Sequence, residues 1–354
     1  MKKLFHFIYF GFVCLFFFNC KEAKAASEPS LNIMSTGHIV MGTSYPESNP
    51  SIPPQDGKTM FEGVKEIFRG GDVIFGNLAA PISDRGFTKK RVDNRNIFAF
   101  RSPARYAKYL KEAGFTVVNA ANNHILDFGF DAYHDTLKSL DDLGIAHTGR
   151  KSDIYKTSIN GISLAVYTMT QPYTESFATH HNIAAAAKII KKLSSENDIV
   201  MVGFHGGREG KGSMHTPRGA ESLGREYRGE PFKLARTLID NGADLVVGYG
   251  PHIPRGIEIY KGRLIAYSLG NFVTYGPFNL RGPYGLSIIL EVKMKKSGEI
   301  IFAKAHPLSL VSKTRGLPVF DPNSKIIEHL NWLSKEDFPD TYARFKKDGT
   351  IILR

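Results

Sequence analysis

The chain has 354 residues, of which 42% are hydrophobic and 23% are charged, with no low-complexity tract. This composition is typical of a globular protein with a sizeable core and excludes a disordered or fibrous chain. The formal net charge of +12 favours anionic partners such as phosphate, an acidic polymer or an anionic lipid, although a basic solvated surface explains the charge equally well. We expect no nucleic-acid partner, because Lys and Arg are scattered and no recognition motif is present.

The N-terminal segment has the pattern of a secretory signal peptide. Two lysines precede an apolar run over residues 4–18, which is too short and wrongly flanked for a typical membrane-spanning helix. Two cleavage positions are open: before Ala26, after an Ala-x-Ala sequence, or before Cys20, which would then carry a lipid anchor. We slightly favour the lipoprotein. In either case we expect residues 1–25 to act as the signal and the protein to be exported to the cell envelope, membrane-anchored or free.

The cysteine content adds a further expectation. Cys14 and Cys20 are the only cysteines, and Cys14 lies in the part removed by either cleavage. We therefore expect a mature protein with no disulfide and no thiolate metal site, which must be stabilised by its hydrophobic core.

Strand and helix patterns alternate in the first half of the chain. Apolar runs predict strands at 32–41, 71–78, 115–121 and 145–149. Helical spacing predicts helices at 59–68, 103–113 and 130–143, with exposed loops at 46–56 and 83–96. Ser102 and Pro103 are typical of a helix start, and Gly114 and Gly144 follow the ends of two predicted helices.

The second half begins with a hairpin pattern, in which Asn160-Gly161 separates two apolar alternations. Strands are predicted at 155–159, 162–169, 198–207, 243–248, 263–268, 285–294 and 300–308, and helices at 181–194, 231–241 and 326–333. The alternation predicts an α/β fold, and the hairpins predict mixed rather than purely parallel sheets. We expect one domain over residues 31–320, with residues 321–354 as an extension packed on it.

Histidines and other polar residues follow the ends of several predicted strands, where α/β sheets bind ligands. These are His38, the group Asn122, Asn123, His124 and Asp127, then His205 with Glu209, and His252, while Asp72 opens the second strand. Imidazole, carboxylate and amide oxygens together suit Mn, Fe or Zn, and such an ion activates a water or polarises a phosphoryl group. Each residue alone is more commonly a turn, capping or surface residue, so the predicted site depends on their combination.

Three blocks of the sequence resemble a known family. They are GNLAAPIS at 76–83, the block from Phe98 to Gly149 that contains AANNHILDFG, and GADLVVGYGPHIPRGIEIYKGRLIAYSLGNFV at 242–273. They are similar to the bacterial capsule synthesis family typified by the poly-γ-glutamate proteins CapA and PgsA, over residues 33–310. That family looks like a branch of the calcineurin-like metallophosphatases. The resemblance implies a four-layer α/β/β/α sandwich with a site for one or two metals, in an exported or membrane-attached protein.

The resemblance also implies roles for individual residues. Asn123, His205 and His252 would be metal ligands, and His124 would donate a proton to a leaving group. His38 and Asp72 complete the predicted metal-ligand set. Substrate contacts are expected from Asn77, Asn122, Asp127, Glu209, Tyr249, Arg255 and Asn271.

The chain departs from the family pattern at four positions. His38 stands where the family has an aspartate, Ala79 where it has a glutamate, and Tyr249 and Gly250 where it has two histidines. A neutral imidazole can bind one ion, but it cannot bridge two as a carboxylate does, and each lost ligand lowers metal affinity. We therefore expect at most one divalent ion, Mn, Fe or Zn, bound weakly or absent.

Three functions are compatible with these observations. The first is an accessory role in the synthesis, export or anchoring of an anionic surface polymer, a capsule or poly-γ-glutamate. Its partners would be the polymer or a phosphate-containing substrate, the membrane through Cys20, and capsule-synthesis membrane proteins. The second is a metal-dependent hydrolase that cleaves a phosphoester or a polymer amide, with His124 as general acid. The third is a binding-only pseudoenzyme. Fold does not decide among the three.

Overall fold

The computed structural model describes residues 28–92, 97–210 and 212–353. The predicted signal segment at 1–25, with Cys20 and Ala26, lies outside the described residues. Within the described part of the chain, no helix has both the length and the apolar character needed to cross a bilayer.

The larger sheet is mixed and has the strand order β16-β15-β14-β1-β2-β3-β4, with β13 also paired to β1. Its parallel part consists of β1 (Ser30–Val40), β2 (Val73–Leu78), β3 (Val117–Asn119), β4 (Ala146–Thr148) and β13 (Asn271–Thr274). Antiparallel pairing adds β14 (Leu286–Lys295), β15 (Ile300–Ser309) and β16 (Val319–Phe320). The prediction of a mixed sheet is confirmed.

The smaller sheet has the order β11-β12-β10-β7-β6-β5. It contains β5 (Tyr155–Ile159), β6 (Ile162–Met169), β7 (Ile199–His205), β10 (Leu245–Tyr249), β11 (Ile257–Tyr260) and β12 (Arg263–Ala266). The predicted hairpin joins β5 to β6, and both Asn160 and Gly161 have positive φ, as a two-residue type I′ turn requires.

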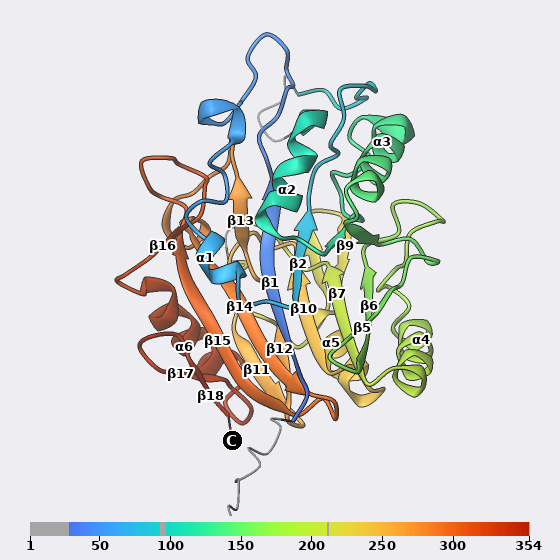
Figure 1. The fold of residues 1–354 in the computed structure, drawn as a ribbon, viewed down its shortest axis with the longest axis vertical. Coiled ribbons are helices and arrows are strands. Elements are labelled where there is room, and N and C mark those ends of the chain that lie inside the picture. The colour runs from blue at the N-terminus through green and yellow to red at the C-terminus, as the bar shows by residue number, and fades with distance from the viewer. Residues whose placement is uncertain (1–27, 93–96, 211, 354) are drawn as a thin grey trace, which may run out of the picture.

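Figure 1 shows the strands of the two sheets with helices around them. Apolar side chains form a cluster between the sheets and a cluster on the outer face of each. Between the sheets, strand residues such as Val73, Val166 and Val247 form one cluster. The outer face of the larger sheet is covered by the segment from Met60 to Phe68, by α2 (Ala107–Ala113) and by part of α3 (Gly129–Asp142). The outer face of the smaller sheet is covered by α4 (Ile183–Glu196) and α5 (Pro231–Asp240). This is the four-layer α/β/β/α sandwich that the sequence predicts.

The helix predicted at 59–68 is much shorter in the structure. Only α1 (Lys65–Phe68) is α-helical, and turns precede it after the 3₁₀ turn Pro54–Gly57. The Cα of Gly63 packs against the carbonyl of Pro318 so closely that a Cβ there would clash. Met60, Phe61 and Val64 are nevertheless buried. The apolar spacing therefore predicted these core residues correctly, but its prediction of a helix over 59–68 was wrong.

The helix predicted at 103–113 begins differently from the expectation. A 3₁₀ turn at Ala104–Tyr106 leads into α2, and the Ser102 hydroxyl donates to the Gly42 carbonyl instead of capping the helix. Its end is as predicted, because Gly114 adopts a left-handed conformation with φ 98° at the C-cap.

The C-terminal segment packs on both sheets. Residues of α6 (Lys325–Asp337) enter the cluster between the sheets, together with Phe345 of β17 (Arg344–Phe345) and Ile351 of β18 (Ile351–Ile352). Isolated bridges join Glu258 to Tyr342 and Lys304 to Thr350. The division at residue 320 stays a prediction.

The two sheets bring their carboxyl ends to a common edge. In the larger sheet His38 pairs with Asn77, and Asn77 pairs with Asn119. In the smaller sheet Tyr249 pairs with His205. Beyond β7, a small hairpin of β8 (Glu221–Leu223) and β9 (Glu226–Gly229) lies over this edge. The candidate site is therefore assembled from segments far apart in the sequence.

Candidate functional site

A cavity of about 490 Å³ opens at this edge, within the ~300–1,000 Å³ typical of small-molecule sites. The predicted site residues that line it are His38, Asn123, His124, Glu209, His252 and Asn271. Aromatic residues, described below, form much of the remaining wall. The sequence thus predicted most of the polar lining, which Asn279 and Tyr284 complete.

His124 is held by a buried carboxylate. Asp127 Oδ2 lies 2.8 Å from His124 Nδ1 and accepts the backbone N–H of Phe100 at 2.9 Å, and Lys90 forms an ion pair with Asp127 Oδ1. Because a carboxylate accepts, His124 Nδ1–H donates and Nε2 is left for a ligand. The Asp127 side chain is almost fully buried, so the expected substrate contact is corrected: Asp127 orients His124.

Asn122 fixes the loop that carries His124. Its Oδ1 accepts the backbone N–H groups of His124 and Ile125, and its Nδ2 donates to the carbonyl of Leu78 at the end of β2. Asn122 is 1% exposed. It therefore holds the loop against the sheet and is not in contact with the cavity, which corrects its predicted role in substrate binding. Asn123, the next residue, does line the cavity.

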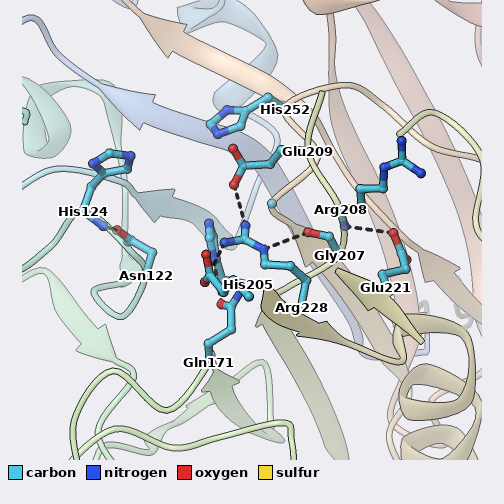
Figure 2. Close-up of polar contacts among 12 residues, drawn as sticks. Asn122, His124, Gln171, His205, Gly207, Arg208, Glu209, Glu221, Arg228 and His252 are labelled. Carbon is cyan, nitrogen blue, oxygen red and sulfur yellow. Dashed lines mark hydrogen bonds and ion pairs between the residues drawn. The ribbon is translucent and has the colours of Figure 1, made fainter. Parts of the chain in front are cut away.

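A buried guanidinium lies behind Glu209, as Figure 2 shows. Arg228 is 1% exposed, donates from Nε to the carbonyl of Gly207 at 3.1 Å, and pairs with Glu209. The Gln171 amide is oriented with its oxygen toward Arg228 Nε at 2.9 Å and its nitrogen toward the carbonyl of His205 at 2.7 Å, since a guanidinium only donates and a carbonyl only accepts. The charge of Glu209 in the cavity is thus compensated.

His38 has hydrogen-bond donors at both ring nitrogens. The backbone N–H of Gly250 donates to Nε2 at 3.1 Å, and Asn77 Nδ2 lies 2.7 Å from Nδ1. The Asn77 orientation is fixed, because its Oδ1 accepts from Asn119 Nδ2, and Asn119 is itself fixed by the N–H and carbonyl of Ala121. A neutral imidazole can accept at one nitrogen only. The surroundings of position 38 therefore suit a side chain that accepts two hydrogen bonds.

His252 is held in a strained conformation. Its φ is 62°, in the left-handed region that residues with a Cβ rarely adopt. Asn271 Nδ2 donates to the carbonyl of Tyr284, so Asn271 Oδ1 accepts from His252 Nδ1–H at 2.9 Å. Its ring stacks on His38, with centroids 4.3 Å apart and planes 23° apart. Backbone strain of this kind is found most often at functional sites.

Three of the histidines at this edge, His38, His205 and His252, have lowered pKa values. Burial, followed by the positive charge of neighbours, holds the pKa of His38 and of His205 well below the usual value, and burial lowers the pKa of His252. His205 Nε2 is buried and has no hydrogen-bond partner within the described residues.

The side chains do not fit a resident divalent ion. Such an ion takes roughly four or more convergent ligands. Both His38 nitrogens face N–H donors, the stacked rings of His38 and His252 do not converge, and the nearby carboxylates Asp127 and Glu209 are paired with Lys90 and Arg228. Across the described residues no three His, Cys, Asp or Glu side chains are grouped to hold a metal. We therefore derive no step through a metal.

Asp72 lies at the opposite end of β2 from the cavity. Val73 pairs with Ile33 near the start of β1, whereas Asn77 pairs with His38 near its end. The Asp72 carboxylate accepts the backbone N–H of Asn32 at 2.8 Å. The predicted ligand role of Asp72 is thus corrected: it is a residue at the start of the strand that joins β1 to β2.

Tyr249 and Arg255 are both buried away from the cavity. The Tyr249 side chain belongs to the cluster between the sheets and is 0% exposed, with its ring against Phe75 and His38. The Arg255 guanidinium pairs with the buried carboxylate of Glu221 and donates to the carbonyl of Ser213 at 2.7 Å. Both predicted substrate contacts are corrected to structural roles, and Asn77, also fully buried, acts through His38.

Lys90 and Asn119 were absent from the sequence prediction. Lys90 is an ordinary basic residue in a loop-like sequence, and Asn119 lies within a strand pattern. Their positions depend on pairings with Asp127 and Asn77, which the sequence separates by 37 and 42 residues. For Lys90, the basic run Lys89-Lys90-Arg91 in the predicted loop was the available signal.

Comparison with known proteins agrees with this architecture. Residues 32–275 match the family described as "Bacterial capsule synthesis protein PGA_cap". The "PGA biosynthesis protein CapA" of Bacillus subtilis (strain 168) is 31% identical over 272 residues, which cover 71% of this chain and 65% of that protein. The chain thus matches slightly less than two thirds of the length of that relative.

Solved structures similar to this chain include a novel phosphatase of Mycoplasma pneumoniae, 10% identical, with a TM-score of 0.50 over 84% of this chain and 96% of that chain. The calcineurin-like phosphoesterase YfkN of Bacillus subtilis is 14% identical, with a TM-score of 0.47 over 81% and 92% of the two chains. At such identities the likeness concerns the fold alone. Because the family match extends over most of the folded residues, the chain belongs to the bacterial capsule synthesis protein family.

Proposed function

We propose that this chain acts at the cell envelope as an accessory protein in the synthesis, export or anchoring of an anionic surface polymer, and that the cavity holds a segment of that polymer. The family and the printed name of the Bacillus subtilis relative support the polymer as the substrate class. The observation that carries the proposal is the basic segment Lys89-Lys90-Arg91, whose middle residue contacts Asp127 and His124 beside the cavity.

The basic segment has the properties that polyanion binding requires. Lys89 and Arg91 are exposed and adjacent in sequence to Lys90, so their charges lie close to the cavity. Interactions between exposed charges are screened within ~10 Å at 0.1 M salt. Binding through these side chains is therefore expected to weaken steeply as salt is added.

Charge reversal of this segment tests the proposal. The double variant Lys89→Glu/Arg91→Glu should weaken poly-γ-glutamate or acidic polysaccharide binding by at least about tenfold at low salt, since each lost charge contact contributes about 1 kcal/mol. The matched control is Lys188→Glu/Lys191→Glu, which makes the same change of charge on exposed residues of α4. Equal binding by both variants, or binding independent of salt, would refute the proposal.

A second candidate function is hydrolysis with His124 as a proton donor. The Asp127 carboxylate holds His124 by Nδ1–H, so an imidazolium at this position would give its Nε2 proton to the leaving-group oxygen as water attacks, and the proton that the water releases would return to Nε2. His124→Ala should then abolish any phosphoesterase activity on p-nitrophenyl phosphate and leave the thermal unfolding curve unchanged. Activity equal to that of the wild type in this variant would end the hydrolase interpretation.

A further inference from the structure

One wall of the cavity is a stack of aromatic rings. Phe98 and Phe100 have centroids 6.0 Å apart and planes 5° apart, and Phe100 and Phe278 have centroids 5.0 Å apart and planes 18° apart. All three line the cavity, and Phe98 is 40% exposed. Phe278 comes from a loop that follows β13, far from the other two in sequence. The fold therefore brings three nearly parallel ring planes to one wall.

The stack is connected to the acid–base residues. The backbone N–H of Phe100 donates to Asp127, and the Phe100 ring lies 4.9 Å from that of His124. A ligand lying on this wall is thus held beside His124. Large exposed aromatic side chains such as Phe98 leave apolar surface in water unless a ligand covers it.

The remaining lining carries planar polar side chains without an uncompensated charge. Asn123 and Asn279 present amides, the Asn271 amide is already bonded to His252 and to the Tyr284 carbonyl, burial lowers the pKa of His252, and Glu209 is paired with Arg228. Amide groups donate and accept at once, and hydroxyl groups do the same, so the two match in pairs. The cavity thus combines an aromatic wall with a set of groups suited to hydroxyls.

We propose that the cavity binds sugar rings, so that the surface polymer handled by this chain is an acidic polysaccharide and not a polyglutamate; this inference rests on the proposed function. The C–H face of a pyranose ring carries partial positive charge and packs on the negative face of an aromatic ring. Ring hydroxyls then meet the amides, and uronate carboxylates reach Lys89 and Arg91. A polyglutamate chain has no ring and leaves the aromatic wall uncovered.

Calorimetric titration of the full mature chain with two probes of similar charge tests this inference. The probes are a hyaluronan hexasaccharide and a γ-linked triglutamate peptide. We expect the hexasaccharide to bind at least tenfold more tightly than the peptide. Phe98→Ala, chosen because this residue is half-exposed and its loss leaves the core intact, should weaken hexasaccharide binding by about tenfold. The matched control is Phe87→Ala, which removes a 92% exposed ring that does not line this cavity.

The outcomes separate this inference from the proposed function. Equal or tighter binding of the peptide, with no effect of Phe98→Ala, overturns the sugar-ring assignment and leaves the polyanion function standing. Hexasaccharide binding that Phe98→Ala does not weaken overturns the role of the aromatic wall. If neither probe binds, and the charge-reversal test with long polymers also fails, the proposed function itself is overturned.

Discussion

At the scale of residues, the site is defined by which nitrogen atoms are free. His124 is fixed by Asp127 with Nε2 left open, whereas both nitrogens of His38 face N–H donors. The family has an aspartate at this position by resemblance, and a carboxylate accepts at both sides without conflict. His38 therefore accepts from only one of the two N–H donors that face it, and it is unsuited to ligate an ion.

The two N–H donors around His38 predict a difference in stability between two substitutions at this position. His38→Leu removes the one acceptor that the imidazole offers to the Gly250 N–H and Asn77 Nδ2, and an unsatisfied buried donor costs about 1–3 kcal/mol. His38→Asn keeps one acceptor oxygen in a smaller volume. We expect the free energy of unfolding, measured with urea, to be about 1–3 kcal/mol lower for the leucine variant than for the asparagine variant. Equal stability of the two would show that the donors do not depend on His38.

At the scale of elements, the sequence predicted the strands and the sheet edge better than the roles of single residues. The alternation in β10 places Val247 and Tyr249 on the face toward the other sheet and Val246 on the face toward the helices. Period-2 alternation alone could therefore have placed Tyr249 in the core. Asp72 precedes β2, whereas His38 and His205 lie near the ends of β1 and β7, and parallel strands put those two ends on opposite edges.

Other features could not be predicted from local pattern. Gly63, just before α1, packs closely against Pro318, which is 255 residues away. The burial of Arg255 depends on its pairing with Glu221 in the small β8–β9 hairpin, which had no strong strand pattern. Such long-range contacts decide which polar residues face the cavity, and spacing in the sequence carries no signal for them.

At the scale of the whole molecule, buried neutral histidines tie stability to pH. Burial lowers the pKa of His180, whose Nε2–H donates to the His205 carbonyl, to about 3 from an ordinary value of 6.5. Between these values the unfolded chain binds more protons than the folded chain, so stability is complete above about pH 6.5 and is lost as the pH falls toward 3. His38, His205 and His252 shift in the same direction.

This linkage gives a measurable dependence of the free energy of unfolding on pH. At about 1.4 kcal/mol per pKa unit, His180 alone removes about 2 kcal/mol of unfolding free energy between pH 6.5 and about pH 5. Urea unfolding at several pH values should show this loss, and His180→Gln, which keeps a donor but does not titrate, should show a smaller one. A pH-independent free energy of unfolding over this range in the wild type would contradict the buried neutral state.

The central proposal is that this four-layer α/β/β/α fold binds an anionic polymer in a cavity that needs no resident metal. The most direct test is calorimetric titration of the protein with acidic polymer at low salt, once in EDTA and once in Mn²⁺ or Zn²⁺. We predict saturable binding of equal affinity in both conditions, weakened by added salt. Binding that is absent in EDTA and restored by the metal ion would contradict the account.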